Sequence, residues 1–273
     1  MEQAELSENE SDRMRLLTFI IIGGGPTGVE MAGIIAELGK SASPSDFRRI
    51  SPNEFRVMLI EGADLVLGTF PAEISSYAKQ ELQGLGVEVM TGLMVEEINA
   101  KGVLLADGTR ETGTLIWCAG VKPTSAARWL GVPTVPDGRI PVTADLRLEG
   151  QPEVFVIGDL AWCLDQQGKP LPGVAPVAKQ QGRFVARCLR NELSGRVTPG
   201  TFKYRDFGML ATIGRGRAVA DFGRFSIKGW LTWWFWGLSH IYFLIARPAR
   251  LLVALKWLLE YVTFQRGSRL IVK

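Results

Sequence analysis

Short hydrophobic runs bounded by glycine alternate with amphipathic stretches along the first 120 residues. The run Thr18–Ile22 is apolar and rich in β-branched residues, which is typical of a strand buried on both faces of a parallel sheet. Val29–Leu38 has helical character, and residues 1–17 form a polar helical lead-in. We therefore expect a doubly wound α/β domain over residues 18–120. Its other strands are predicted at Phe55–Ile60, within Val87–Val103, and at Leu115–Gly120.

Pro and Gly become frequent after this domain. Val154–Ile157 then predicts another buried strand, which ends at Gly158 and Asp159. A helix is expected from about Pro176 to Leu193, and these elements make up a second region, residues 121–205. The last region, residues 206–273, begins with a hairpin predicted at Met209–Ile213 and Arg217–Phe222.

The C-terminal region is apolar, aromatic and basic. Residues 229–246 hold 18 positions without a formal charge, which is the lower limit for a spanning helix. Several tryptophans argue against a span, because Trp is enriched at membrane interfaces. Leu251–Phe264 is apolar except for one polar stripe, and arginines flank it. The pattern predicts an amphipathic helix lying in a membrane surface, and a core-packing or dimer-interface helix is the alternative. The stripe is Lys256, Glu260 and Thr263, and the arginines are Arg247, Arg250, Arg266 and Arg269.

The overall composition narrows the class of protein. The 273 residues are 47% hydrophobic and 22% charged, which excludes wholesale disorder. A mean hydropathy of +0.12 is too low for a polytopic membrane protein, and a net charge of +3 gives no case for a nucleic-acid partner. Cys118, Cys163 and Cys188 lack metal-ligand spacing, and His240 is the single histidine, so we expect no metal site. The odd cysteine count favours a reducing compartment, and the acidic N-terminus lacks the apolar core of a signal peptide.

The segment between the first strand and the first long helix carries a dinucleotide-binding pattern. Gly23, Gly25 and Gly28 match GxGxxG in the required context, with a strand before and a helix after. Gly23 permits the tight turn, Gly25 lets the backbone approach a pyrophosphate, and Gly28 allows close packing of helix and strand. The helix N-terminus then offers free N–H groups to the phosphates. The alternative interpretation is an ordinary turn between strand and helix.

An acid at the end of the next strand completes this pattern. Glu61 lies there, 33 residues after Gly28, and the excess over the usual spacing of about 20 fits an insertion at Ala42–Asn53. A carboxylate at this place binds ribose hydroxyls and repels a 2′-phosphate, so the pattern favours NADH over NADPH. The alternative is that Glu61 only faces solvent.

A second strand end carries another carboxylate. Gly158 and Asp159 end a predicted strand, at the edge where α/β folds place their ligands. Gly173–Pro176 then leads into a helix whose positive N-terminus suits a ligand that develops negative charge, such as a reduced flavin. By itself a Gly-Asp strand end is usually only a turn.

These residues resemble one family, the type II NADH dehydrogenases, which are NADH:quinone oxidoreductases. The segments that carry the resemblance run in order through essentially the whole chain: FIIIGGGPTGVEMAGIIAEL, VMLIEGADLVL, LIWCAGVKP, VFVIGDLA, LPGVAPVAKQQGRFVA and YVTFQRGSRL. The resemblance implies a doubly wound NADH-binding domain at residues 18–120 and the second half of an FAD-binding domain at 121–205. It also implies a hairpin and membrane-attachment region at 206–273, with FAD and NADH as cofactors.

The resemblance further implies roles for single residues. Glu30 would lie near the nicotinamide, and Gln180 and Gln181 would lie beside flavin and quinone. The positions implied for NADH are Gly23, Gly25, Gly28, Glu61, Ala119 and Gly120. The positions implied for FAD are Gly158, Asp159, Pro176 and Val177, with Asp159 bonded to the FAD chain and the Val177 N–H directed at the flavin ring. Pro176 is a departure, because some members carry glutamine there.

The beginning of the chain also departs from the family pattern. The family opens with another strand–GxGxxG–helix unit, which binds the ADP half of FAD, whereas Met1 falls near the end of that unit. The expectation from this comparison is a fragment, a split gene or a late start codon.

Three hypotheses about function follow. The leading one is a respiratory flavoenzyme that oxidises NADH, passes electrons through FAD to a membrane quinone and pumps no protons. It would be a peripheral protein on the cytoplasmic face of the cell membrane, would contact lipid through its C-terminal region and could form a homodimer. The second is a catalytically incomplete NADH-binding fragment or subunit that needs a separate FAD-binding chain. The third, a sulfide:quinone or disulfide reductase, requires paired redox cysteines, which the sequence does not provide.

Overall fold

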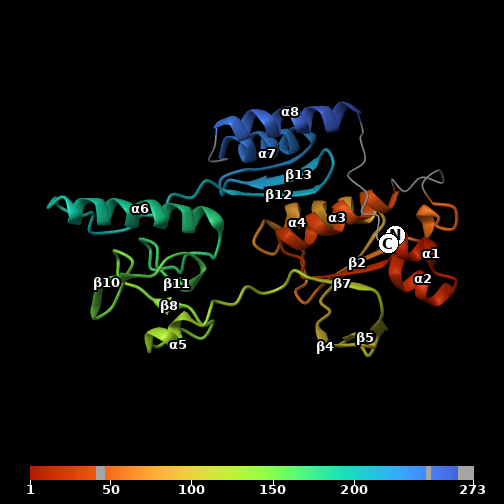
Figure 1. Ribbon diagram of the computed structural model, residues 1–273, viewed down its shortest axis with the longest axis horizontal. Coiled ribbons are helices and arrows are strands. Elements are labelled where there is room, and N and C mark those ends of the chain that lie inside the picture. Colours follow the sequence, from red (N-terminus) through yellow and green to blue (C-terminus); the bar gives the residue numbers. More distant parts are fainter. Residues whose placement is uncertain (41–46, 244–246, 264–273) are drawn as a thin grey trace. The chain divides into compact units, whose positions relative to one another are not determined.

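The computed structural model describes residues 1–40, 47–243 and 247–263 (Figure 1). The chain forms two compact units. The first unit consists of residues 1–119 and 208–273, and the second unit consists of residues 120–207. Each unit has hydrophobic clusters of its own, and the two are described separately.

A four-stranded parallel sheet lies at the centre of the first unit. Its order is β3-β2-β1-β7, so the first strand of the chain has a neighbour on each side. In register, Ile22 is paired with both Ile60 and Trp117. The predicted strands at Thr18–Ile22 and Phe55–Ile60 are confirmed within one residue at each end. The bounds are β1 Thr18–Ile22, β2 Arg56–Glu61, β3 Val87–Thr91 and β7 Thr114–Trp117.

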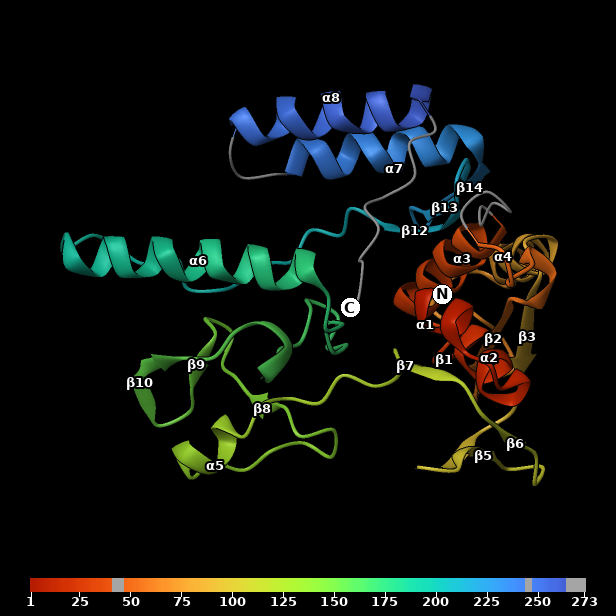
Figure 2. The ribbon, with the colours of Figure 1, turned by 45° about the vertical axis from the view of Figure 1, so that its right-hand side comes forward.

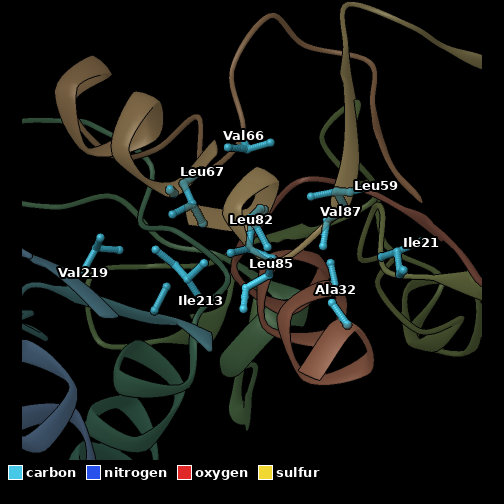
Figure 3. Close-up of a cluster of buried hydrophobic side chains, with 14 of the residues drawn as sticks. Ile21, Ala32, Leu59, Val66, Leu67, Leu82, Leu85, Val87, Ile213 and Val219 are labelled. Atoms are coloured by element: carbon cyan, nitrogen blue, oxygen red, sulfur yellow. The ribbon is translucent and has the colours of Figure 1, made fainter. Parts of the chain in front are cut away.

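The two faces of this sheet are covered by different structures. Two helices, α3 (Pro26–Lys40) and α4 (Ala72–Gly84), pack on the face to which Ile21 and Leu59 point (Figure 3). An antiparallel meander covers the other face, where its side chains pack against Ile20 and Ile22. Part of the predicted strand region 87–103 therefore belongs to this meander and not to the parallel sheet. The meander strands are β4 Val95–Asn99, β5 Gly102–Leu105 and β6 Arg110–Glu111.

The polar lead-in forms two short helices, α1 (Glu2–Leu6) and α2 (Glu10–Leu17). Asn9 caps α2 by accepting backbone N–H groups with its side chain, as helix starts require. A small hydrophobic cluster packs these helices against the rest of the unit, and its buried residues are Ala4, Leu17 and Ile50. The predicted helical lead-in is thereby confirmed as two helices. A 3-10 turn, η1 (Pro52–Glu54), precedes β2.

The predicted hairpin packs against α3, although some 180 residues separate them in sequence. Its strands are β12 (Met209–Gly214) and β13 (Arg217–Asp221), which confirms the hairpin, and β14 (Ser226–Gly229) adds a third antiparallel strand. Ile213 and Val219 are buried in the same cluster as residues of α3 and α4 (Figure 3). Ala211 belongs to this cluster as well.

The C-terminal end of the first unit forms two helices that lie side by side (Figure 2). They are α7 (Trp230–Phe243) and α8 (Arg247–Thr263). Within the described ranges, no helix combines the length and apolarity that crossing a bilayer requires. Parts of the predicted surface segment, namely residues 244–246, Phe264, Arg266, Arg269 and the end of the YVTFQRGSRL motif, lie outside the described residues.

The second unit is built around a short parallel pair and one long helix. β8 (Ile140–Pro141) pairs with β11 (Ala161–Trp162), and α6 (Ala175–Leu193) confirms the predicted helix. The predicted buried strand Val154–Ile157 is wrong in its extent, because β10 (Gln151–Phe155) ends earlier and Ile157 is 37% exposed. The physical reason is that β10 has one described neighbour, the short antiparallel β9 (Arg147–Leu148), so no second strand extends the pairing to Ile157. Val154, Phe155 and Val156 still pack into the hydrophobic clusters of the unit. The remaining elements are α5 (Ala126–Leu130) and the 3-10 turn η2 (Gly158–Leu160).

Candidate functional site

The glycine-rich loop of the first unit has the backbone geometry that the pattern requires. Gly23 has φ +105°, a conformation that favours glycine, and its N–H donates to the Ile60 carbonyl at 2.8 Å. A Cβ on Gly28 would lie 1.7 Å from the Gly23 carbonyl oxygen, so only glycine lets the helix start this close to the strand. A Cβ on Gly25 would meet nothing within 4 Å. The loop is thus tightly packed at Gly23 and Gly28 and open at Gly25.

The start of α3 offers free donors beside that opening. The first helical hydrogen bond runs from the Val29 N–H to the Gly25 carbonyl at 3.0 Å. Pro26, the first helical residue, has no N–H, and the N–H groups of Thr27 and Gly28 precede Val29, the first donor of the helical hydrogen bonds. Donors of this kind at a helix N-terminus attract phosphate.

Glu61 is half-buried and its carboxylate is directed at the glycine loop. One oxygen accepts the Gly24 N–H, and the other accepts the Ala63 N–H at 2.8 Å. Leu67, which is fully buried and has φ +50°, donates its N–H to the Gly24 carbonyl at 2.7 Å. Hydrogen bonds therefore fix both the N–H and the carbonyl group of Gly24. A carboxylate has about four acceptor positions, so Glu61 keeps capacity for ribose hydroxyls.

Glu30 lies on α3, one turn after the glycine loop, and contacts the hairpin. Its Oε1 accepts the Thr212 N–H at 3.1 Å. Glu37, two turns further on, accepts the Arg215 N–H at 2.6 Å. Between them lies Gly33, where a Cβ would stand 1.6 Å from the Ile213 carbonyl oxygen. Sequence reasoning missed Gly33 and Glu37, and the only available signal was the glycine inside an otherwise good helix.

The end of β7 closes over the glycine loop. The Cys118 N–H donates to the Ile22 carbonyl at 2.8 Å, which continues the pairing of β7 with β1 past Trp117. A Cβ on Gly23 would lie 2.8 Å from the Ala119 nitrogen, so Ala119, one of the positions that the resemblance implies for NADH, packs on the loop. Gly120, with φ +62°, is the first residue of the second unit.

The second unit brings Gly158 and Gln181 together. Gly158 has φ +68°, and its N–H donates to the Gln181 side-chain oxygen at 2.6 Å. Asp159 is exposed, and within the described chain its carboxylate makes no hydrogen bond or ion pair. It lies beside Gly173, where a Cβ would be 3.5 Å from the Asp159 Oδ1. The unpaired carboxylate is an acceptor available to a ligand hydroxyl.

Three other predicted positions lie on the first two turns of α6. Pro176 is exposed, whereas the Val177 side chain is buried and its N–H donates to the Val174 carbonyl at 3.0 Å. Gln180 forms two bonds with Arg205, donating from Nε2 to the carbonyl at 2.8 Å and accepting the N–H at 3.0 Å. The amides of Gln180 and Gln181 therefore both hold backbone within their own unit.

The cysteines do not form a redox pair in this structure. Cys118, Cys163 and Cys188 are free thiols. Burial raises the pKa of all three above the ordinary value, which keeps them protonated and poorly nucleophilic near neutral pH. Among the residues that the structure describes, no group of three His, Cys, Asp or Glu side chains is placed to hold a metal ion.

A parallel sheet with a glycine loop and a strand-end acid defines a dinucleotide-binding fold. The family model of the pyridine nucleotide-disulphide oxidoreductases matches residues 1–182, and the chain belongs to this family. Within it, the chain is similar to two type II NADH:quinone oxidoreductases of Mycobacterium tuberculosis, Ndh and NdhA. The identities are 36% over 279 residues and 32% over 280 residues, and each comparison covers 98% of this chain. The resemblance drawn from the sequence motifs is thereby confirmed.

The chain spans 59% of the length of Ndh and 58% of that of NdhA. A solved structure with a similar fold is NDH2 from Plasmodium falciparum in complex with NADH, with a TM-score of 0.84 and 19% identity. That comparison covers 95% of this chain and 69% of the other.

Proposed function

We propose that this chain takes part in the oxidation of NADH, with electrons passed through FAD to a membrane quinone and no proton pumping. The observation that carries the proposal is the glycine loop, open at Gly25 and braced by the half-buried Glu61. The similarity to Ndh and NdhA, which are type II NADH:quinone oxidoreductases, supports the choice of substrates.

In this proposal the residues of the first unit bind and orient NADH. The pyrophosphate lies over Gly25 and accepts hydrogen bonds from the N-terminal N–H groups of α3, where the positive end of the helix favours an anion. Glu61 accepts the hydroxyls of the adenosine ribose and disfavours a 2′-phosphate by repulsion. Glu30, one turn into α3, lies toward the nicotinamide end of the proposed NADH site. Ala119 and Gly120 line the path of the dinucleotide across the end of β7.

The residues of the second unit fit an FAD-binding role in part. The unpaired Asp159 carboxylate can accept a hydroxyl of the FAD chain, and Gly158 is held in its left-handed conformation by Gln181. FAD, when bound, supplies the two-electron chemistry that connects a hydride donor to a quinone. Pro176, Val177 and Gln180 are proposed to surround the flavin and quinone as backbone and packing positions, since the Gln180 amide is already engaged by Arg205.

A membrane-surface role is proposed for α7 and α8. Large apolar side chains on both helices are exposed, among them Leu231 at 72%, Leu252 at 68% and Leu259 at 61%. Exposed apolar area of this extent on neighbouring helices is typical of a surface that binds lipid or another protein. A lipid-soluble quinone would then be reached from a peripheral position on the cytoplasmic face of the membrane.

The test of the NADH site compares two glycine variants. Gly25→Leu fills the open position over which the pyrophosphate is proposed to lie, whereas Gly84→Leu adds the same side chain at another position with nothing within 4 Å. We expect Gly25→Leu to weaken NADH binding about hundredfold, as losing charge-assisted phosphate contacts implies, and Gly84→Leu to leave it unchanged. The measurement is NADH fluorescence titration on folded protein. Equal affinity in all three proteins would rule out this site.

A second candidate function is an NADH-binding subunit that needs a separate FAD-binding chain. The short parallel strands of the second unit favour it, because β8 and β11 each hold two residues. The visible absorption spectrum of the chain, after reconstitution with FAD, separates the two functions. A flavin band that bleaches on adding NADH supports the complete electron route. NADH binding without a flavin band supports the subunit.

A further inference from the structure

A groove on the second unit is lined by cations without acidic partners. It lies between α6 and residues 199–203 and has a volume of about 700 Å³. Arg183, Arg187 and Arg190 line it from the helix, and Lys203 lines it from the segment. No carboxylate is among its described lining residues, and none of these four exposed side chains makes an ion pair or hydrogen bond in the described chain.

The helix presents its three arginines in one row. Positions 183, 187 and 190 are spaced i, i+4 and i+7, so they share one face of α6 and extend over about 10 Å of its axis. Like charges at this spacing repel each other and destabilise a helix. A bound anion would remove that repulsion, and a multivalent one could contact more than one guanidinium.

The floor of the groove is fixed by packing and by backbone hydrogen bonds. Phe184 and Phe202 are both buried and pack edge to face, with ring centroids 5.6 Å apart. The Phe202 N–H donates to the Ala144 carbonyl at 2.7 Å. At either end of the segment, Gln180 binds the Arg205 backbone and Asn191 donates to the Val197 carbonyl at 2.7 Å. The groove is therefore preformed and does not depend on a ligand to order it.

We propose that this groove binds a phosphate-bearing anion. The planar guanidinium group binds phosphate oxygens in pairs, and arginine is accordingly the residue most used for phosphate recognition. The volume lies within the range of small-molecule sites, and the buried phenylalanines with Pro199 give an apolar surface for the rest of the ligand. The phosphate can belong to a free anion or to a lipid headgroup. The proposal does not depend on the NADH site, which uses none of these residues.

The test uses the folded chain, inorganic pyrophosphate and lipid vesicles. Arg183→Gln with Arg187→Gln removes two charges from the groove. The matched control, Lys169→Gln with Arg196→Gln, removes two exposed charges from the same unit outside the groove. Pyrophosphate binding is measured by isothermal titration calorimetry at low ionic strength, where screening is weak. Vesicle binding is compared between phosphatidylglycerol and phosphatidylcholine.

Each result of the pyrophosphate and vesicle measurements either supports or overturns the proposed anion site. Pyrophosphate affinity that falls at least tenfold in the groove variant and not in the control supports a site for a free anion. Absence of pyrophosphate binding, with phosphatidylglycerol binding that falls tenfold in the groove variant alone, supports a site for a lipid headgroup. Equal effects in the two variants, or no binding of either probe, would overturn the proposal. Thermal melting confirms that all variants are folded.

Discussion

Replacing Gly33 by alanine tests how the hairpin is held on α3. In an isolated helix this change is stabilising by about 1 kcal/mol, because glycine is a poor helix former. In this structure the new methyl group would lie 1.6 Å from the Ile213 carbonyl oxygen, whereas real Cβ atoms essentially never come within 3.0 Å of another atom. The obstacle is backbone on both sides, so α3 and β12 must move apart.

The size of the effect follows from what that movement disturbs. Overpacking a well-packed contact costs about 1–3 kcal/mol. Separation also weakens the hydrogen bonds from Thr212 to Glu30 and from Arg215 to Glu37, each of which has a charged acceptor and contributes about 1.5–3 kcal/mol. After the gain in helix propensity is subtracted and partial relaxation is allowed, we expect a net loss of about 2–4 kcal/mol in the free energy of unfolding.

The assay is urea unfolding followed by circular dichroism at 222 nm, with Gly84→Ala as the matched control. Gly84 ends α4 in the same unit, and a Cβ there meets nothing within 4 Å, so this variant should be as stable as the original protein or slightly more so. A Gly33→Ala protein as stable as Gly84→Ala would refute the close contact between α3 and β12.

Three further predictions concern charge and burial. Glu61→Gln should lower the ratio of the Kd for NADPH to the Kd for NADH about tenfold by removing the repulsion of a 2′-phosphate, and an unchanged ratio in fluorescence titrations would contradict the role of this carboxylate. Because burial raises the pKa of Cys163, the unfolded chain releases this proton first, so stability should fall as the pH rises above about 8.5. Urea titrations at several pH values should show a smaller loss of stability above this pH for Cys163→Ala than for the original protein. An identical loss in both proteins would contradict the assignment of this pH dependence to Cys163. Arg56→Met should lower the free energy of unfolding by about 1–2 kcal/mol, because Arg56 forms ion pairs with Glu88 at 2.8 Å and Glu111 at 2.6 Å. An unchanged stability in calorimetry would show that these ion pairs do not stabilise the fold.

The features that the sequence predicts well are those encoded within about 15 neighbouring residues. The strand at Thr18–Ile22 carries its own evidence, because four consecutive apolar residues after Thr18, followed by glycines, are compatible with few other structures. The glycine loop is similar, since strand, loop and helix are contiguous. Glu61 could be located by the end of its strand even though its distance from Gly28 is unusual.

The features that the sequence does not reveal depend on distant partners. Nothing near Gly33 indicates that β12 packs against it, because the contact joins residues 180 positions apart. Val154–Ile157 has the apolar composition of a buried strand, yet burial depends on neighbouring strands, and its one described neighbour is short and antiparallel. Gln180 looks like a ligand-binding amide, and its use for the Arg205 backbone is a tertiary contact that local pattern cannot predict.

α3 connects the two parts of the first unit that the proposed function requires. Its N-terminus forms the glycine loop, and one and two turns later it holds β12 through Glu30 and Gly33. A helix is stiff along its axis, so a shift forced at Gly33 moves the N-terminal donors relative to Glu61, which is held by β2. We therefore expect Gly33→Ala to weaken NADH binding although Gly33 does not line the loop. Since a 1 Å displacement is enough to impair a positioned site, NADH affinity would report this shift at urea concentrations far below unfolding.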